Sequence, residues 1–155
     1  MNIGILEKAL SEFITENTKG LIFPVKDKQE ESRAVKVVSG FLPPNTVVDE
    51  IPAIAIRFSD GQDNIDTRFF NFDLYFAIYD KEPIEGYKGL VLLIETVINK
   101  ITEEKYIGKY FVFEDIAEYE IEDEQPYPFW IGSARVKFSA PKPSYIGNRE
   151  GGYFG

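Results

Sequence analysis

The clearest pattern along the chain is a strict alternation of apolar and mixed positions between Thr67 and Tyr79. Side chains of a β-strand point to opposite faces with a period of two, so this segment predicts a long strand with two different faces. One face is fully apolar and consists of Phe70, Phe72, Leu74, Phe76 and Ile78. The other face is mixed and consists of Phe69, Asn71, Asp73, Tyr75, Ala77 and Tyr79. The pattern indicates the middle strand of an antiparallel sheet that has one wetter side.

Two segments repeat their apolar residues at the three- and four-residue spacing of an amphipathic helix. The first covers residues 3–17, with an apolar stripe of Ile5, Leu6, Ala9, Leu10, Phe13 and Ile14. The second covers residues 87–102, with a stripe of Leu90, Leu93, Ile94, Val97, Ile98 and Ile101. Each helix is expected to pack its stripe on one face of the sheet, because an amphipathic element must bury its apolar side.

Shorter β-rich segments predict further strands at residues 34–42, 53–58 and 131–140, with another strand opening at 110–113. Charged or turn-forming segments between these elements are predicted as connections, at residues 26–33, 45–51, 60–64 and 80–86. The expected fold class is α+β: a mostly antiparallel β-sheet with an N-terminal helix and a second helix packed on one face. Residues 1–141 are expected to form a single domain, and residues 142–155, rich in Pro and Gly, a flexible C-terminal tail.

Composition narrows the function classes. The 155 residues include 17 basic and 26 acidic side chains, a net charge of −9, which argues against a protein that grips nucleic acid through its overall field. There is no cysteine, so no disulfide is expected, which fits a reducing cytoplasm. The N-terminus shows no basic region followed by a long apolar run, and no apolar window approaches the length of a membrane span. We therefore expect neither a signal peptide nor membrane insertion.

The sequence offers little catalytic chemistry. It contains no histidine and no cysteine, which excludes Ser-His-Asp and Cys-His catalysis and the usual zinc sites. No glycine-rich phosphate-binding motif occurs, so carboxylates are the only candidate reactive groups. Residues 60–64 carry oxygen ligands but lack the spacing of a calcium loop, so a turn is preferred there. Residues 114–124 are acidic enough to suggest a Mg²⁺ site, yet no Lys or Arg lies between Lys109 and Arg135 to hold phosphate, so a solvated strand edge or loop is preferred. We expect no enzyme, no metal and no cofactor.

The most distinctive local string is Pro-Tyr-Pro-Phe-Trp at residues 126–130. Tyr127, Phe129 and Trp130 form a candidate interface, because aromatic residues dominate the energetics of protein–protein contacts. The alternative is structural: Phe129 and Trp130 cap the core where the last strand enters the sheet. The two interpretations are compatible, and both stay open at this point.

The order of several short motifs resembles a known family. Val-Ser-Gly-Phe-Leu-Pro-Pro at residues 38–44 is followed by Ile-Pro-Ala-Ile-Ala-Ile-Arg at 51–57, the turn at 60–64 and the long strand. Asp80 and Gly86-Tyr87 then precede the second helix, and Glu-Gln-Pro-Tyr-Pro-Phe-Trp-Ile-Gly at 124–132 precedes a strand that ends at Pro141. Over residues 34–141 this order is similar to that of the tail terminator (tail completion, head–tail joining) proteins of siphophages and prophages of Gram-positive bacteria.

The resemblance implies a virion structural protein rather than an enzyme. Family members form a ring, commonly a hexamer, at the head-proximal end of the tail tube, where it stops tube polymerisation and offers a surface to the head connector. Partners would be further copies of the chain, the tail-tube protein and the connector or stopper protein, with DNA passing through without specific binding. The location would be the virion tail, after assembly in the cytoplasm of the bacterial host.

The resemblance also suggests candidate sites for ring contacts and for the lumen of the ring. Polar loops at residues 26–32, 45–51 and 60–66 are expected to supply ring contacts, with Asp49, Glu50 and Asp63 as candidate interface residues. The acidic residues Glu122, Asp123 and Glu124 are candidates for a lumen that repels DNA.

Three alternatives come from different classes of protein. The first is another head–tail joining component, such as a stopper, an adaptor or a minor tail protein. The second is a non-viral ligand-binding α+β module, which would need a closed apolar pocket with convergent polar groups. The third is a metal-dependent nuclease, which a cleavage assay with Mg²⁺ or Mn²⁺ would reveal.

Overall fold

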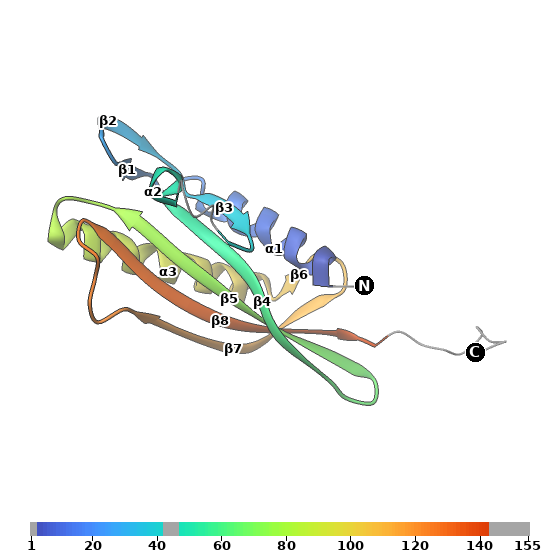
Figure 1. Cartoon of the computed structure of the whole chain (residues 1–155). Helices are drawn as coiled ribbons and strands as arrows, with labels where there is room; N and C mark the ends of the chain where they lie inside the picture. The colour runs from blue at the N-terminus through green and yellow to red at the C-terminus, as the bar shows by residue number, and fades with distance from the viewer. Residues whose placement is uncertain (1–2, 42–46, 143–155) are drawn as a thin grey trace.

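The computed structural model describes residues 3–41 and 47–142 of the chain, and Figure 1 shows how its elements are arranged. Two long helices, α1 (Ile3–Thr18) and α3 (Pro83–Glu104), lie on one side of a curled sheet. The sheet contains β3 (Lys36–Ser39), β4 (Ala53–Asp63), β5 (Thr67–Tyr79), β6 (Tyr106–Ile107), β7 (Phe111–Ile121) and β8 (Phe129–Pro141). A separate hairpin joins β1 (Phe23–Val25) to β2 (Lys28–Arg33), and a single helical turn, α2 (Val47–Glu50), precedes β4. The predicted α+β class, with both helices on one face, is confirmed.

The strand order is β3-β4-β5-β8-β7-β6, so β5 lies in the interior of the sheet, as the alternation predicted. Strands β3 and β4 are parallel, and every other neighbouring pair is antiparallel. The longest pairing joins β5 to β8 over thirteen residues, from Thr67 opposite Pro141 to Tyr79 opposite Phe129. This pairing places the C-terminal strand beside the central one.

The core lies between the helices and one face of the sheet. All five apolar side chains predicted for that face of β5 are at most 2% exposed. They pack with the predicted helical stripes: Leu6, Leu10 and Ile14 of α1, and Leu90, Leu93 and Ile101 of α3, are at most 1% exposed. The predicted stripe of α1 was wrong at Ile5, which is 51% exposed. Among the described residues no helix covers the opposite face of the sheet (Figure 1), and we call it the open face.

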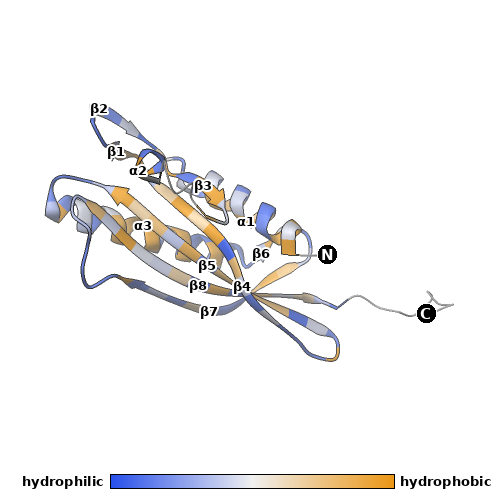
Figure 2. Cartoon of the chain, in the orientation of Figure 1, coloured by the Kyte–Doolittle hydropathy of each residue, from blue (hydrophilic) through white to orange (hydrophobic). Residues whose placement is uncertain are grey.

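Three predicted connections are wrong in part. Residues 28–33 form strand β2 rather than a loop, because backbone pairing with β1 builds the strand although its sequence has no apolar alternation; Figure 2 shows this strand as hydrophilic. The predicted turn at Asp60–Gly61 belongs to β4, which continues through a register shift after Phe58 to Asp63. Helix α3 begins at Pro83 rather than at Tyr87, because proline fits the first turn of a helix, where its missing N–H costs nothing.

The other boundaries differ less. The strand predicted at residues 34–42 is shorter, and its last residue lies outside the described part of the chain, as do residues 45–46 of the next loop. The acidic segment after Phe113 belongs to strand β7, which ends at Ile121. Of the predicted tail, only Lys142 is described, with its backbone N–H donating to the carbonyl of Asp66 at 2.9 Å; residues 143–155 lie outside the described residues. No helix within residues 3–41 and 47–142 is long and apolar enough to cross a membrane.

Candidate interaction surfaces

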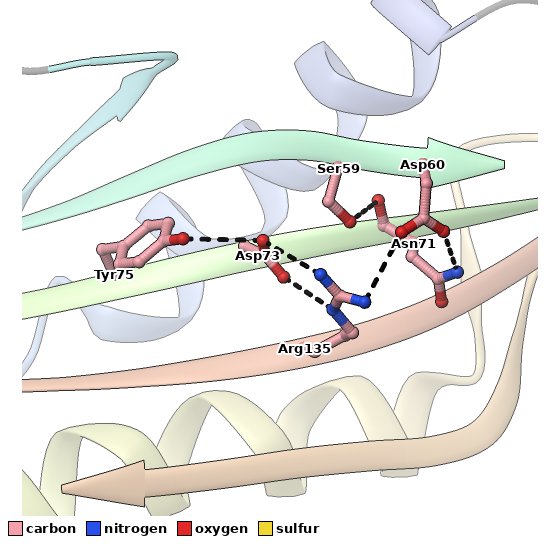
Figure 3. A network of polar contacts seen from close by, with 6 residues as sticks. All are labelled: Ser59, Asp60, Asn71, Asp73, Tyr75 and Arg135. Atoms are coloured by element: carbon pink, nitrogen blue, oxygen red, sulfur yellow. Dashed lines mark hydrogen bonds and ion pairs between the residues drawn. The ribbon is translucent and has the colours of Figure 1, made fainter.

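A network of charged and amide groups crosses the open face over β4, β5 and β8 (Figure 3). Arg135 donates from Nε to Asp73 Oδ1 at 2.9 Å, and its Nη1 lies 3.5 Å from Asp60 Oδ2. Asn71 donates from Nδ2 to Asp60 Oδ1 at 2.6 Å, which closes the chain of contacts. The hydrogen bonds to Asp73, together with its charge, raise the pKa of the Arg135 guanidinium above its usual range. The network ties three strands together, and the single guanidinium of Arg135 is shared between the two carboxylates of Asp60 and Asp73.

Two neighbouring hollows lie on the open face. The first has a volume of about 260 Å³ and a mainly acidic rim, because Asp73, Glu118 and Glu120 line it beside Arg135. We call it the acidic hollow. The second, of about 330 Å³, has a floor of small residues that includes Ala53, Ala55, Ala77 and Gly132. We call it the apolar hollow. Tyr75 and Ser133 line both, so the two hollows are neighbours on the sheet.

Arg57 stands at the border of the apolar hollow between two aromatic rings. Its guanidinium carbon lies 3.8 Å from the centre of the Phe41 ring and 4.1 Å from the centre of the Tyr75 ring. Its Nε donates to the backbone carbonyl of Gly40 at 3.0 Å. Phe41 is 75% exposed, so the stack presents both an aromatic ring and a positive charge to solvent.

Of the three aromatic residues in the predicted interface, two pack against other side chains and one is largely exposed. Trp130 packs against the core, and its indole Nε1–H donates to the carbonyl of Asp80 at 3.0 Å. Phe129 lies against Tyr79, with ring centres 5.4 Å apart. Tyr127 is 57% exposed but donates its hydroxyl to the carbonyl of Lys81 at 2.7 Å. These contacts support the structural interpretation for Phe129 and Trp130, while an interface role for the three residues stays a prediction.

The other candidate interface residues lie on two separate elements. Asp49 and Glu50 belong to α2, where Asp49 is exposed and Glu50 pairs with Lys36 at 2.8 Å. Asp63 ends β4 and accepts two hydrogen bonds from Arg68, at 2.9 and 3.0 Å. This pairing holds the pKa of the Asp63 carboxyl below its ordinary value. The structure does not bring these residues together in one patch.

The candidate lumen residues Glu122, Asp123 and Glu124 are all exposed and lie between β7 and β8. Gln125 braces this connection, because its side chain donates to the carbonyls of Glu122 at 2.7 Å and Ile131 at 3.0 Å. Since β8 begins opposite the end of β5, this acidic connection and the β4–β5 turn lie at opposite ends of the sheet. Glu122 also lines the apolar hollow.

Metal-ligating groups do not gather in the described part of the chain: no three of its Asp or Glu side chains are placed to hold one ion. Asp60, weighed above as a calcium ligand, is instead engaged with Asn71 and Arg135.

No protein-family model matches this sequence, and no curated protein matches it.

Sequence reasoning missed the Arg135 network and the Arg57 stack. A partial signal existed, because Asn71, Asp73 and Tyr75 alternate on the mixed face of the central strand. Their partners lie far along the chain: Asp73 and Arg135 are 62 residues apart and meet only through the β5–β8 register. The alternation thus predicted that this face of β5 is polar, but not which side chains of β4 and β8 its polar groups contact.

Proposed function

We propose that this chain is a tail terminator, a virion structural protein that forms a ring at the head-proximal end of a phage tail tube. In this role it stops polymerisation of the tube and provides the surface to which the head attaches. Its partners are further copies of itself, the tail-tube protein and the head connector or stopper protein. It acts by binding, without catalysis and without a cofactor.

The observation that carries the proposal is the open face. One side of the sheet is covered by α1 and α3, while the other presents a braced charged network, a stacked Arg57 and a depression with an apolar floor. A contiguous surface of apolar floor and polar rim is typical of protein–protein contacts. The fold, α+β with helices on one face, is also the one that the resemblance implies. Both features suit a protein that assembles with other proteins.

The decisive experiment measures assembly and activity together. Light scattering behind a sizing column, over a concentration series, is expected to give a discrete species of about six subunits, near 106 kDa for chains of 17.7 kDa, without added DNA or metal. The purified protein is then added to growing tail tubes, whose length is measured by electron microscopy. We expect growth to stop at substoichiometric amounts of terminator relative to tube protein. Tubes that elongate unchanged would overturn the terminator assignment and favour another head–tail joining protein.

The acidic connection between β7 and β8 is proposed to face the lumen of the ring. Glu122, Asp123 and Glu124 are exposed and contribute three negative charges, which repel the phosphate backbone of DNA. Replacing all three with lysine is expected to slow DNA ejection from assembled virions, measured by release of labelled genome. The matched control replaces Glu7, Glu12 and Glu16 of α1 with lysine, which changes the net charge equally at another place. Equal ejection rates for both triple variants would count against the lumen position.

A further inference from the structure

The hairpin between β4 and β5 presents one apolar side chain to solvent. Figure 1 shows the hairpin extending beyond the helices, away from the body of the sheet. Ile65, in its turn, is 95% exposed, the largest exposed fraction among the large apolar side chains of the described residues. An isoleucine in this position contributes nothing to the core of its own chain, and burying it elsewhere would be favourable.

This turn is held in shape by several contacts. The N–H of Asn64 donates to the carbonyl of Thr67 at 2.7 Å, and the Asp63–Arg68 ion pair spans the base of the turn. The carbonyl of Asp66 accepts the N–H of Lys142, which links the turn to the end of β8. A braced turn loses little conformational entropy when it binds. It therefore has the properties of a preformed anchor.

The apolar hollow has the complementary properties. Its lining includes Ala53, Ala55 and Ala77, and its volume of about 330 Å³ exceeds that of one isoleucine side chain. Arg57 lines the hollow and makes no ion pair with any of the described residues. The hairpin turn carries Asp66 directly beside Ile65. An apolar anchor and a carboxylate on one chain thus match an apolar floor and a guanidinium on another, provided that the carboxylate lies on the Arg57 side of the hollow, away from Glu122.

The hairpin of one chain cannot reach its own hollow. Ala55 and Asp63 lie on the same strand, and at about 3.3 Å per residue they are separated by roughly 26 Å. The two features therefore lie at opposite ends of one rigid element and are available only to different molecules. Contacts between unlike surfaces of identical chains propagate head to tail and close into a ring when the rotation permits.

We propose that the hairpin turn of one copy inserts Ile65 into the apolar hollow of a second copy, with Asp66 facing Arg57. The inference rests on the proposed function in that it names a contact between neighbouring subunits of the ring. The occupant of the hollow is thus a second copy of this chain, and the contact is heterologous.

The absence of cysteine from the chain allows a direct test by cross-linking. One variant carries Asn64→Cys beside the anchor, and the other carries Ser133→Cys at the border of the hollow. Mixing the two with a short bismaleimide is expected to give a mixed dimer as the main product. A mixture of Ile84→Cys with Ser133→Cys serves as control, since Ile84 is an exposed isoleucine on α3. Equal yields from both mixtures would overturn the proposal.

A second substitution tests the anchor itself. Ile65→Ser in the Asn64→Cys chain is expected to lower the yield of mixed dimer about tenfold or more, because burial of an isoleucine corresponds to at least that factor in affinity. Ile84→Ser in the same chain is expected to leave the yield unchanged. An unchanged yield with Ile65→Ser would show that another part of the hairpin, or another surface, makes the contact.

The outcome for this contact is separable from the outcome for the proposed function. If Ile65→Ser abolishes cross-linking while the wild-type protein fails to stop tube growth, the contact is correct and the terminator assignment is wrong. If tube growth stops and cross-linking is insensitive to Ile65, the assignment holds and the contact is wrong.

Discussion

Replacing Phe72 with alanine should lower the free energy of unfolding by about 3–5 kcal/mol, a large part of the stability of an ordinary domain. Phe72 is fully buried at the centre of the sheet. Its ring lies edge-on to Phe58, with centres 5.8 Å apart, and to Phe138, with centres 6.4 Å apart. The substitution leaves a cavity between three strands that cannot collapse, because both neighbouring rings are held by their own strands.

Urea denaturation followed by circular dichroism measures this loss. The matched control is Phe41→Ala, since Phe41 is 75% exposed and its removal gives up only the stack on Arg57, about 0.5–1 kcal/mol. A similar loss for both variants would contradict the central position assigned to Phe72.

Replacing Gly86 with alanine should cost about 2–3 kcal/mol, although alanine is the better helix former. A Cβ at Gly86 would lie 2.2 Å from Nε1 and 2.4 Å from Cε2 of Trp130. The indole would have to move, and its hydrogen bond to the carbonyl of Asp80 would break. Because Trp130 is the single tryptophan of the chain, its fluorescence reports this movement directly.

We expect the emission of Gly86→Ala to shift to longer wavelength and its thermal unfolding to begin earlier. Gly89→Ala in the same helix is the control, since its Cβ would come closest to the terminal Cδ1 of Ile78, at 3.1 Å, and would otherwise make only ordinary contacts with the Phe23 ring, at 3.5 and 3.8 Å. That side-chain end can move, so the net change should stay within about 1 kcal/mol. Unchanged emission in the Gly86 variant would show that the indole is not seated against this helix.

The elements predicted best from the sequence are those whose burial pattern is complete. Strand β5 was predicted with its observed ends, because every second side chain from Phe70 to Ile78 is buried. Helix α1 was predicted to within one residue of its end at Thr18, because its buried residues recur every four positions. Where a segment has no apolar residues to alternate, as in β2, the sequence period carries no information and the backbone pairing with β1 makes the strand.

The candidate surfaces were harder to predict, since they depend on register. Asp49, Glu50 and Asp63 were chosen as polar loop residues, but the structure separates them and uses Glu50 and Asp63 in ion pairs. The apolar hollow could not be predicted from the sequence, because the alanines at positions 53, 55 and 77 are compatible with any position in a strand. Nothing in the sequence around Ile65 distinguishes it from a buried isoleucine, because its exposure follows from its place in the β4–β5 turn.

The strand order also has a consequence for synthesis of the chain. Strand β5 pairs with β4 at once, but its other edge pairs with β8, whose residues follow only after α3 and β7. A nascent chain that has reached the end of α3 therefore exposes one full edge of its central strand, together with the apolar face that Val136 and Phe138 later help to bury. An unpaired edge of this kind can pair with another chain. The core can close only after β8 has been translated. Misassembly between nascent chains is therefore expected chiefly on crowded polysomes, where several unfinished copies lie close together.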